Sequence, residues 1–141
     1  NMQINTNYTN KKPDNNKLIF PELSYLLTGI CFDVHNTLGR FSKEKQYCDV
    51  LEGKLKNSNV PYKRELKIQN TGNVLDFVID NKIVLEIKAK RVLLKEDYYQ
   101  LQRYLQTVNM KLGLLVNFRN RYLKPARVIK IDTDARKKLL P

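Results

Sequence analysis

The chain has 141 residues, the length of one domain, and its 26 Lys and Arg against 14 Asp and Glu give a formal net charge of +12. Its apolar fraction of 42% is typical of a water-soluble protein, and no apolar run approaches the roughly 20 residues of a membrane span. Two cysteines and one histidine argue against a disulfide framework or a zinc site. Composition therefore predicts a cytoplasmic protein with a polyanionic partner, of which nucleic acid is the commonest, or else a generally basic surface without one.

The chain is expected to contain one folded domain between two tails. Residues 1–20 are rich in Asn, Thr and Lys and predict a flexible N-terminal tail. Residues 21–134 carry the periodic apolar positions and form the predicted domain. Residues 135–141 form a basic C-terminal end that is expected to fray.

The apolar pattern predicts helices first and a sheet afterwards. Apolar residues recur at helical spacing from 21 to about 38. They recur again in a second helix, for which Ser42 is the expected N-cap and which is expected to end near 57–59. The later elements are strands over 62–68, 74–79 and 83–87, a helix over 95–108, and strands over 112–118 and 127–131. The order α-α-β-β-β-α-β-β predicts an α/β fold, with a mixed β-sheet flanked by helices.

Two acidic residues interrupt the apolar strands of the predicted hairpin. Asp76 lies between leucine and phenylalanine, and Glu86 lies between leucine and isoleucine, where an unpaired buried carboxylate is costly. A two-residue turn, 80–81, would pair Asp76 with Leu85 and turn Glu86 to the other face. A three-residue loop, 80–82, would place the two carboxylates opposite each other.

Lys88 follows Glu86 by two residues and therefore emerges on the same face of its strand. Two carboxylates, a backbone carbonyl and an ammonium group suit Mg²⁺ with its water, and Mn²⁺ could substitute for it. The alternative is a simple cross-strand ion pair on an exposed sheet face, because this spacing is short and common.

Two pairs of side chains on the predicted helices could face the same site. Glu44 and Tyr47 are three residues apart, and Gln100 and Tyr104 are four apart with Arg103 between them. Taken singly, a helical tyrosine is more often a core residue and a glutamine is more often solvated. Only their conjunction with the hairpin carboxylates indicates a site.

In this conjunction the sequence resembles the GxxExxY family of the PD-(D/E)XK nuclease superfamily, from about Glu22 to Ile131. The segments that carry the resemblance are Glu22-Leu23-Ser24, Phe32 to Gly39, Glu44 to Tyr47, Asp76, Glu86-Ile87-Lys88-Ala89, Gln100 to Leu105 and Lys111 to Phe118. One position departs from the family pattern: the glycine expected three residues before Glu44 is Phe41, although Gly39 lies close by.

The resemblance implies a restriction-endonuclease-like core and a set of site residues. Glu44, Asp76 and Glu86 would bind the metal, directly or through water in the case of Glu44. Lys88 would orient the attacking water and stabilise charge on the phosphate. Gln100 and Tyr104 would position the nucleic-acid backbone or a catalytic water. The residues predicted to contact the substrate are Tyr47, Lys90, Arg91, Arg103 and Tyr104.

The resulting functional prediction is a Mg²⁺-dependent nuclease that hydrolyses phosphodiester bonds, with DNA favoured over RNA as substrate and no membrane partner. The alternative is a catalytically silent nucleic-acid-binding module of the same fold. A third class, a defence-associated interaction protein, fits the small size but has no residue signal of its own. A homodimer that cuts two strands is compatible with the sequence, and His35 is expected to have a structural hydrogen-bonding role.

Overall fold

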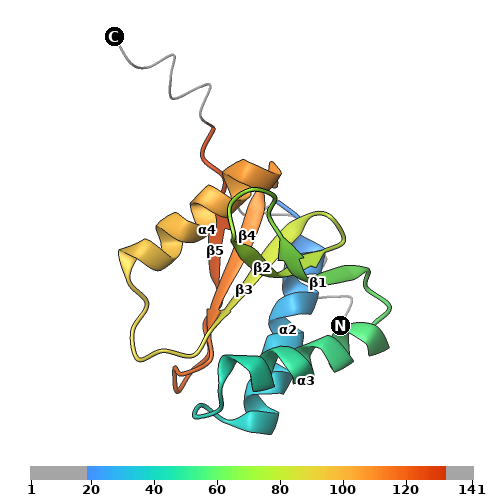
Figure 1. Cartoon of the computed structure of the whole chain (residues 1–141). Coiled ribbons are helices and arrows are strands. Elements are labelled where there is room, and N and C mark those ends of the chain that lie inside the picture. The colour runs from blue at the N-terminus through green and yellow to red at the C-terminus, as the bar shows by residue number, and fades with distance from the viewer. Residues whose placement is uncertain (1–18, 133–141) are drawn as a thin grey trace, which may run out of the picture.

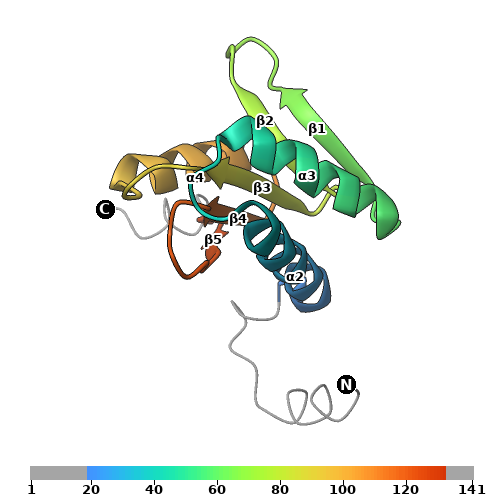
Figure 2. The same ribbon diagram turned by 90° about the horizontal axis from the view of Figure 1, so that it is seen from below.

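The computed structural model describes residues 19–132, in which one sheet lies between two layers of helices (Figures 1 and 2). The helices are α2 (Pro21–Leu38), α3 (Glu44–Asn57) and α4 (Lys95–Val108). The strands are β1 (Tyr62–Lys67), β2 (Val74–Ile79), β3 (Ile83–Lys88), β4 (Leu112–Asn117) and β5 (Ala126–Ile129). Among these described residues, no helix combines the length and the apolar character that crossing a membrane would require.

The predicted order of elements and the predicted α/β class are confirmed, with two local differences. Helix α3 is capped by Lys43 rather than by Ser42, because the Gln46 side chain reaches back and accepts the Lys43 amide at 2.8 Å. Strand β5 ends at Ile129 instead of continuing to Ile131. The α4 side chain of Gln102 accepts the Ile131 amide at 2.8 Å, so a side chain there replaces the strand ladder.

The predictions for residues 1–18 and 133–141 lie outside the described part of the chain. Ile19 and Phe20, which were included in the predicted tail, are partly buried against the core. An η nitrogen of Arg127 donates to the Ile19 carbonyl at 2.9 Å and anchors this segment to β5. The described structure therefore begins two residues before α2.

The five strands lie in sequence order, β1-β2-β3-β4-β5, and only the β3–β4 pair is parallel. Helix α4 connects these two parallel strands, as a parallel pair requires a crossover connection. Nearly all of β3 and all of β4 are buried, whereas β1 alternates between half-buried and exposed positions as an edge strand does. The centre of the sheet is thus covered on both faces.

Each face of the sheet has its own apolar cluster. The first packs α2 and α3 against one face, with Leu27, Val34, Leu51 and Leu55 from the helices and Phe77, Ile83, Leu85, Ile87 and Val116 from the strands. The second packs α4 against the other face, with Leu101, Tyr104 and Leu105 from the helix and Leu75, Val78, Val84 and Leu115 from the strands. Figures 1 and 2 show α4 on the opposite side of the sheet from α2 and α3. Residues at odd positions of β3 therefore face α2 and α3, and even positions face α4.

Candidate active site

The β2–β3 hairpin has the three-residue loop that places its two carboxylates together. Ile79 pairs with Ile83, so residues 80–82 form the loop, and the paired register continues to Phe77 and Leu85. Asp80 and Asn81 take left-handed φ values of 51° and 53°, which aspartate and asparagine tolerate better than most residues. This register puts Asp76 opposite Glu86, and the two-residue alternative is excluded.

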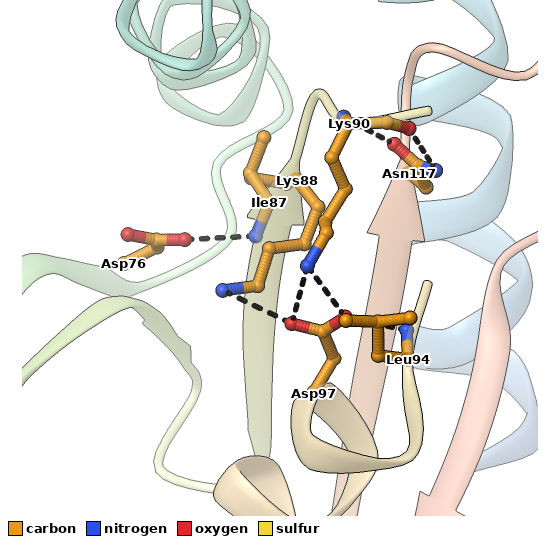
Figure 3. Close-up of polar contacts among 7 residues, drawn as sticks. All are labelled: Asp76, Ile87, Lys88, Lys90, Leu94, Asp97 and Asn117. Atoms are coloured by element: carbon orange, nitrogen blue, oxygen red, sulfur yellow. Dashed lines mark hydrogen bonds and ion pairs between the residues drawn. The ribbon is translucent and has the colours of Figure 1, made fainter. Parts of the chain in front are cut away.

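Where β2 and β3 stop pairing, the two carboxylates accept hydrogen bonds from backbone amides in place of the interstrand carbonyls. The Asp76 amide donates to Oε1 of Glu86 at 3.0 Å, and the Ile87 amide donates to Oδ2 of Asp76 at 2.8 Å (Figure 3 shows the second bond). Each carboxylate thus replaces a missing interstrand acceptor with one of its oxygens. The second oxygen of each carboxylate, Oδ1 of Asp76 and Oε2 of Glu86, is left for another partner.

Strand β2 also bends at this point. Leu75 belongs to the α4 cluster and Phe77 to the α2–α3 cluster, although strict alternation would put them on the same face. In β1, Glu65 lies in the register position opposite Asp76 and has a φ of 55°, a strained value for a non-glycine residue in a strand. The bend separates β2 from β3 and opens the position that the two carboxylates occupy.

Burial makes ionisation of both carboxylates unfavourable. Glu86 is 5% exposed, and burial together with the nearby charge of Asp76 raises its pKa from 4.5 to about 8. Burial likewise raises the pKa of Asp76, with a further contribution from the charge of Glu44 and an opposing one from the amide of Ile87. Two acids held together in this way favour a cation between them.

Glu44 is the first residue of α3 and is exposed. Its negative charge contributes to raising the pKa of both Asp76 and Glu86, so it lies near them. Within residues 19–132, however, no three His, Cys, Asp or Glu side chains form a group that could hold one metal ion. The structure therefore brings two of the three predicted metal ligands together and leaves Glu44 beside them rather than among them.

Lys88 and Lys90 converge on the buried Asp97 (Figure 3). The Lys90 ammonium lies 2.9 Å from Oδ2 of Asp97, and the Lys88 ammonium lies 3.9 Å from Oδ1. Partial burial raises the pKa of Asp97, but the Leu94 amide and Lys90 outweigh this effect and hold the pKa below its usual value. The charge of Lys88 also lowers the pKa values of Asp76 and Glu86, so Lys88 lies near that pair as well as near Asp97.

Asn117 fixes the segment that follows Lys88. Its Nδ2 donates to the Lys90 carbonyl at 2.7 Å and its Oδ1 accepts the Lys90 amide at 3.0 Å (Figure 3). The Phe118 amide donates to the Lys88 carbonyl at 2.8 Å, which extends the β3–β4 ladder by one bond. The backbone around Lys88 is held by β4 on one side, and this limits where its side chain can point.

Helix α4 carries three of the predicted site residues, Gln100, Arg103 and Tyr104, and only Tyr104 is buried. Tyr104 is buried, and this burial, together with the charges of Glu86 and Asp76, raises the pKa of its hydroxyl. Gln100 is half-buried one turn earlier, and Arg103 is exposed. The structure thus brings Tyr104 near the carboxylates. Arg91, in the loop before α4, is exposed.

Tyr47 occupies a different position from the one its predicted role requires. Its side chain is fully buried, and its hydroxyl donates to the Gly39 carbonyl at 2.6 Å and accepts the Ser42 amide at 3.2 Å. In place of the predicted substrate contact, these bonds give Tyr47 a structural role in holding the 39–43 loop before Glu44. Nε2 of His35 is 2.9 Å from the Asn120 carbonyl, in agreement with its predicted structural role.

Asp97 and Asn117 received no role from the sequence. The signal for Asp97 was its position at the third residue of α4, where a side chain can accept the N-cap amide. The signal for Asn117 was an amide at the end of a strand that is otherwise apolar. Neither signal reveals that both residues organise Lys88 and Lys90.

One of three comparisons with known proteins gave a match. A search of curated proteins and a search of solved structures each gave none. The family model of the PD-(D/E)XK nuclease superfamily matches residues 21–130, which span every helix and strand described above. With its acidic pair and lysine at the open end of a hairpin in a mixed sheet, the chain belongs to the PD-(D/E)XK nuclease superfamily.

Proposed function

We propose that this protein is a Mg²⁺-dependent nuclease that hydrolyses phosphodiester bonds, with DNA as the preferred substrate. Membership of the superfamily supports a nuclease-like function. The observation that carries the proposal is a pair of adjacent carboxylates, the buried Glu86 and the half-buried Asp76, each with one oxygen held by a backbone amide. A charge pair of this kind inside a protein is costly unless a cation neutralises it.

The donor set fits magnesium. Mg²⁺ prefers oxygen ligands and is usually held by one or two carboxylates while it keeps several waters. Oδ1 of Asp76 and Oε2 of Glu86 would supply the two carboxylate ligands, and Glu44 would act through a water molecule. When bound, the ion would neutralise charge on the phosphate and make a water molecule more acidic.

The remaining residues act on the substrate or on water. Lys88 would orient the attacking water and stabilise charge that develops on the phosphate oxygens. Gln100 and Tyr104 would position that water or the nucleic-acid backbone from α4. Phosphate contacts are assigned to Lys90, Arg91 and Arg103, because a formal charge of +12 favours a polyanion.

Membership of the GxxExxY family is part of the proposal. Glu44 and Tyr47 supply the acidic residue and the tyrosine of that motif, and Tyr47 holds the loop that precedes Glu44. Phe41 takes the place of the motif glycine. A homodimer able to cut both strands also stays a prediction.

The direct test is a cleavage assay on supercoiled, linear and single-stranded DNA and on RNA, with Mg²⁺, Mn²⁺ or EDTA. Wild-type protein should cut with metal and not in EDTA. Asp76→Asn and Glu86→Gln should each lower the rate by about 10²-fold or more, the scale of losing one preorganised charged group. Asp80→Asn is the matched control, since it removes a carboxylate from the loop of the same hairpin.

Three outcomes separate the alternatives. Cleavage that persists in EDTA or in Asp76→Asn contradicts the metal site. Binding of nucleic acid without cleavage under every metal favours a silent binding module of the same fold. Faster cleavage of RNA than of DNA contradicts only the proposed substrate preference.

A further inference from the structure

Phe41 is an exposed aromatic residue placed against two arginines. Its side chain is 75% exposed in the loop between α2 and α3. The guanidinium carbon of Arg40 lies 4.9 Å from the centre of the Phe41 ring, and that of Arg119 lies 5.6 Å away. Leaving a phenylalanine in water forgoes the stabilisation that its burial would give, so its exposure between cations indicates a contact surface.

The two arginines are fixed in place by each other's backbone. Nε of Arg40 donates to the Arg119 carbonyl at 2.8 Å, and Nε of Arg119 donates to the Arg40 carbonyl at 3.1 Å. These bonds use the ε nitrogens and leave the η nitrogens for a ligand. None of the salt bridges formed within residues 19–132 involves either arginine, whereas Arg64 is neutralised by Asp49 and Glu52.

A second exposed aromatic residue, Tyr122, lies in the loop that carries Arg119. Tyr122 is 79% exposed, and the guanidinium carbon of Arg121 lies 5.4 Å from its ring centre. The next residue, Leu123, is buried in the core and holds this loop against the protein. Figures 1 and 2 show the loop after β4 beside the loop between α2 and α3. We call this surface the aromatic platform; it consists of Arg40, Phe41, Arg119, Arg121 and Tyr122.

The aromatic platform borders the candidate active site. Phe41 precedes Glu44 by three residues, so a chain length of at most about 10 Å separates them. Arg119 follows Asn117 by two residues, and Asn117 is the β4 partner of Lys88. The platform therefore lies at the end of the sheet where β3 and β4 carry the site.

We propose that the aromatic platform binds single-stranded nucleic acid by stacking unpaired bases on Phe41 and Tyr122, a proposal that rests on the nuclease function proposed above. Aromatic rings interleaved with cations bind single strands because every unpaired base has an open face and every link carries a phosphate charge. Bases inside a duplex have both faces covered by their neighbours. The substrate class is thus a single strand or a single-stranded end, bound with little sequence preference.

The test uses fluorescence, because the chain has no tryptophan. Phe41→Trp, combined with Glu86→Gln to prevent cleavage, introduces the only indole. A single-stranded thymidine oligonucleotide should quench its emission as a base stacks on it, and a blunt duplex of equal charge should not. In the same background, Phe41→Ala should weaken binding of the single strand about 5- to 150-fold, the loss of one stacked base.

Tyr25→Ala is the matched control, since Tyr25 is 82% exposed on α2, about 20 Å along the helix from its C-terminal end. It should bind the single strand as well as the parent protein does. An unquenched indole, an unchanged affinity in Phe41→Ala or equal quenching by the duplex would overturn the platform.

The experiments distinguish a failure of the aromatic platform from a failure of the proposed nuclease function. If the protein with Glu86 intact cuts no nucleic acid but the indole is quenched by single strands, the platform stands and the nuclease function fails. If it cuts and Phe41→Ala leaves the KM for single strands unchanged, the platform fails and the nuclease function stands.

Discussion

The ring of Tyr47 stacks on the ring of Phe118 with centroids 4.4 Å apart and an interplanar angle of 17°. This contact joins the first turn of α3 to the residue after β4, and so it ties the helix that begins with Glu44 to the strand that pairs with Lys88 of β3. Offset stacking of two buried rings adds to the stabilisation from their burial. The geometry between Glu44 and the carboxylates therefore depends on an aromatic contact within the core.

Tyr47→Phe should keep the stack and remove the hydroxyl. The Gly39 carbonyl and the Ser42 amide lose their partner, so the free energy of unfolding should fall by about 1–2 kcal/mol. Cleavage should also slow, because the loop before Glu44 is no longer held. Tyr62 lies on the edge strand β1, and its hydroxyl is hydrogen-bonded to Glu52 of α3. Tyr62→Phe removes this hydroxyl and should leave the cleavage rate unchanged. An equal loss of rate in both variants would show a general effect of stability.

Glu86 should make the metal-free protein less stable as pH rises. The folded state keeps the Glu86 proton up to a pKa of about 8, whereas the unfolded chain releases it near 4.5. In EDTA, the free energy of unfolding should therefore fall between about pH 4.5 and 8, by up to a few kcal/mol. Glu86→Gln should remove most of this fall and unfold at a higher temperature than wild type at pH 8.

Urea denaturation at several pH values measures this effect, with Asp80→Asn as the control carboxylate. Mg²⁺ should raise the melting temperature more at pH 8 than at pH 6, because the metal binds the deprotonated carboxylates. A wild-type stability that does not change between pH 5 and 8 in EDTA would contradict the account of Glu86.

Asp97 should position Lys88 without touching the substrate. Asp97→Asn keeps an acceptor for the Leu94 amide but loses the charge that attracts the two lysines. Cleavage should fall about 10- to 100-fold, the range seen for groups that orient an active-site residue, while the melting temperature changes little. Asp97→Ala should also lose the helix cap and about 1 kcal/mol of stability. If Asp97→Asn cuts as fast as wild type, Lys88 does not depend on Asp97.

A side chain at Gly113 should destabilise the protein, because α4 packs directly on this glycine. A Cβ atom at Gly113 would lie 2.8–2.9 Å from three side-chain atoms of Leu101, which is buried. Gly113→Ala should therefore cost about 1–3 kcal/mol, as overpacking does. Gly53→Ala on α3 meets open space and should instead stabilise by about 0.5–1 kcal/mol. Thermal unfolding of the two variants in parallel distinguishes a local clash from a general effect of glycine replacement.

The elements of this fold were predictable because their signals are local. Helical and alternating apolar spacing gave the element order, and the bounds of α4 and β2 agree with the structure. Sequence spacing alone does not determine whether Asp76 and Glu86 lie on the same face of the sheet, because it is compatible with a two-residue turn and with a three-residue loop. The structure selects the longer loop, in which Asp80 and Asn81 both accept left-handed conformations.

The contacts that organise the site were not predictable, because they join distant segments through buried polar groups. Asn117 bonds to Lys90 across 27 positions, and no periodicity records such a contact. Tyr47 has the spacing of a site residue, but its burial depends on the position of Phe118. Sequence patterns indicate which faces are apolar, whereas the partner of a polar group depends on how the elements pack.

The alignment of Asp76 with Glu86 depends on the length of the three-residue β2–β3 loop more than on which amino acids form that loop. Asp76 lies four positions before the first loop residue and Glu86 lies four positions after the last, and removing or adding one loop residue would turn one carboxylate to the opposite face of the sheet. A designer could replace residues 80–82 with another sequence of equal length that accepts left-handed positions, and the acidic pair would keep its alignment. A shortened turn could preserve a stable hairpin and still separate the pair, so a well-folded variant could lose its chemistry through a change that touches no active-site residue.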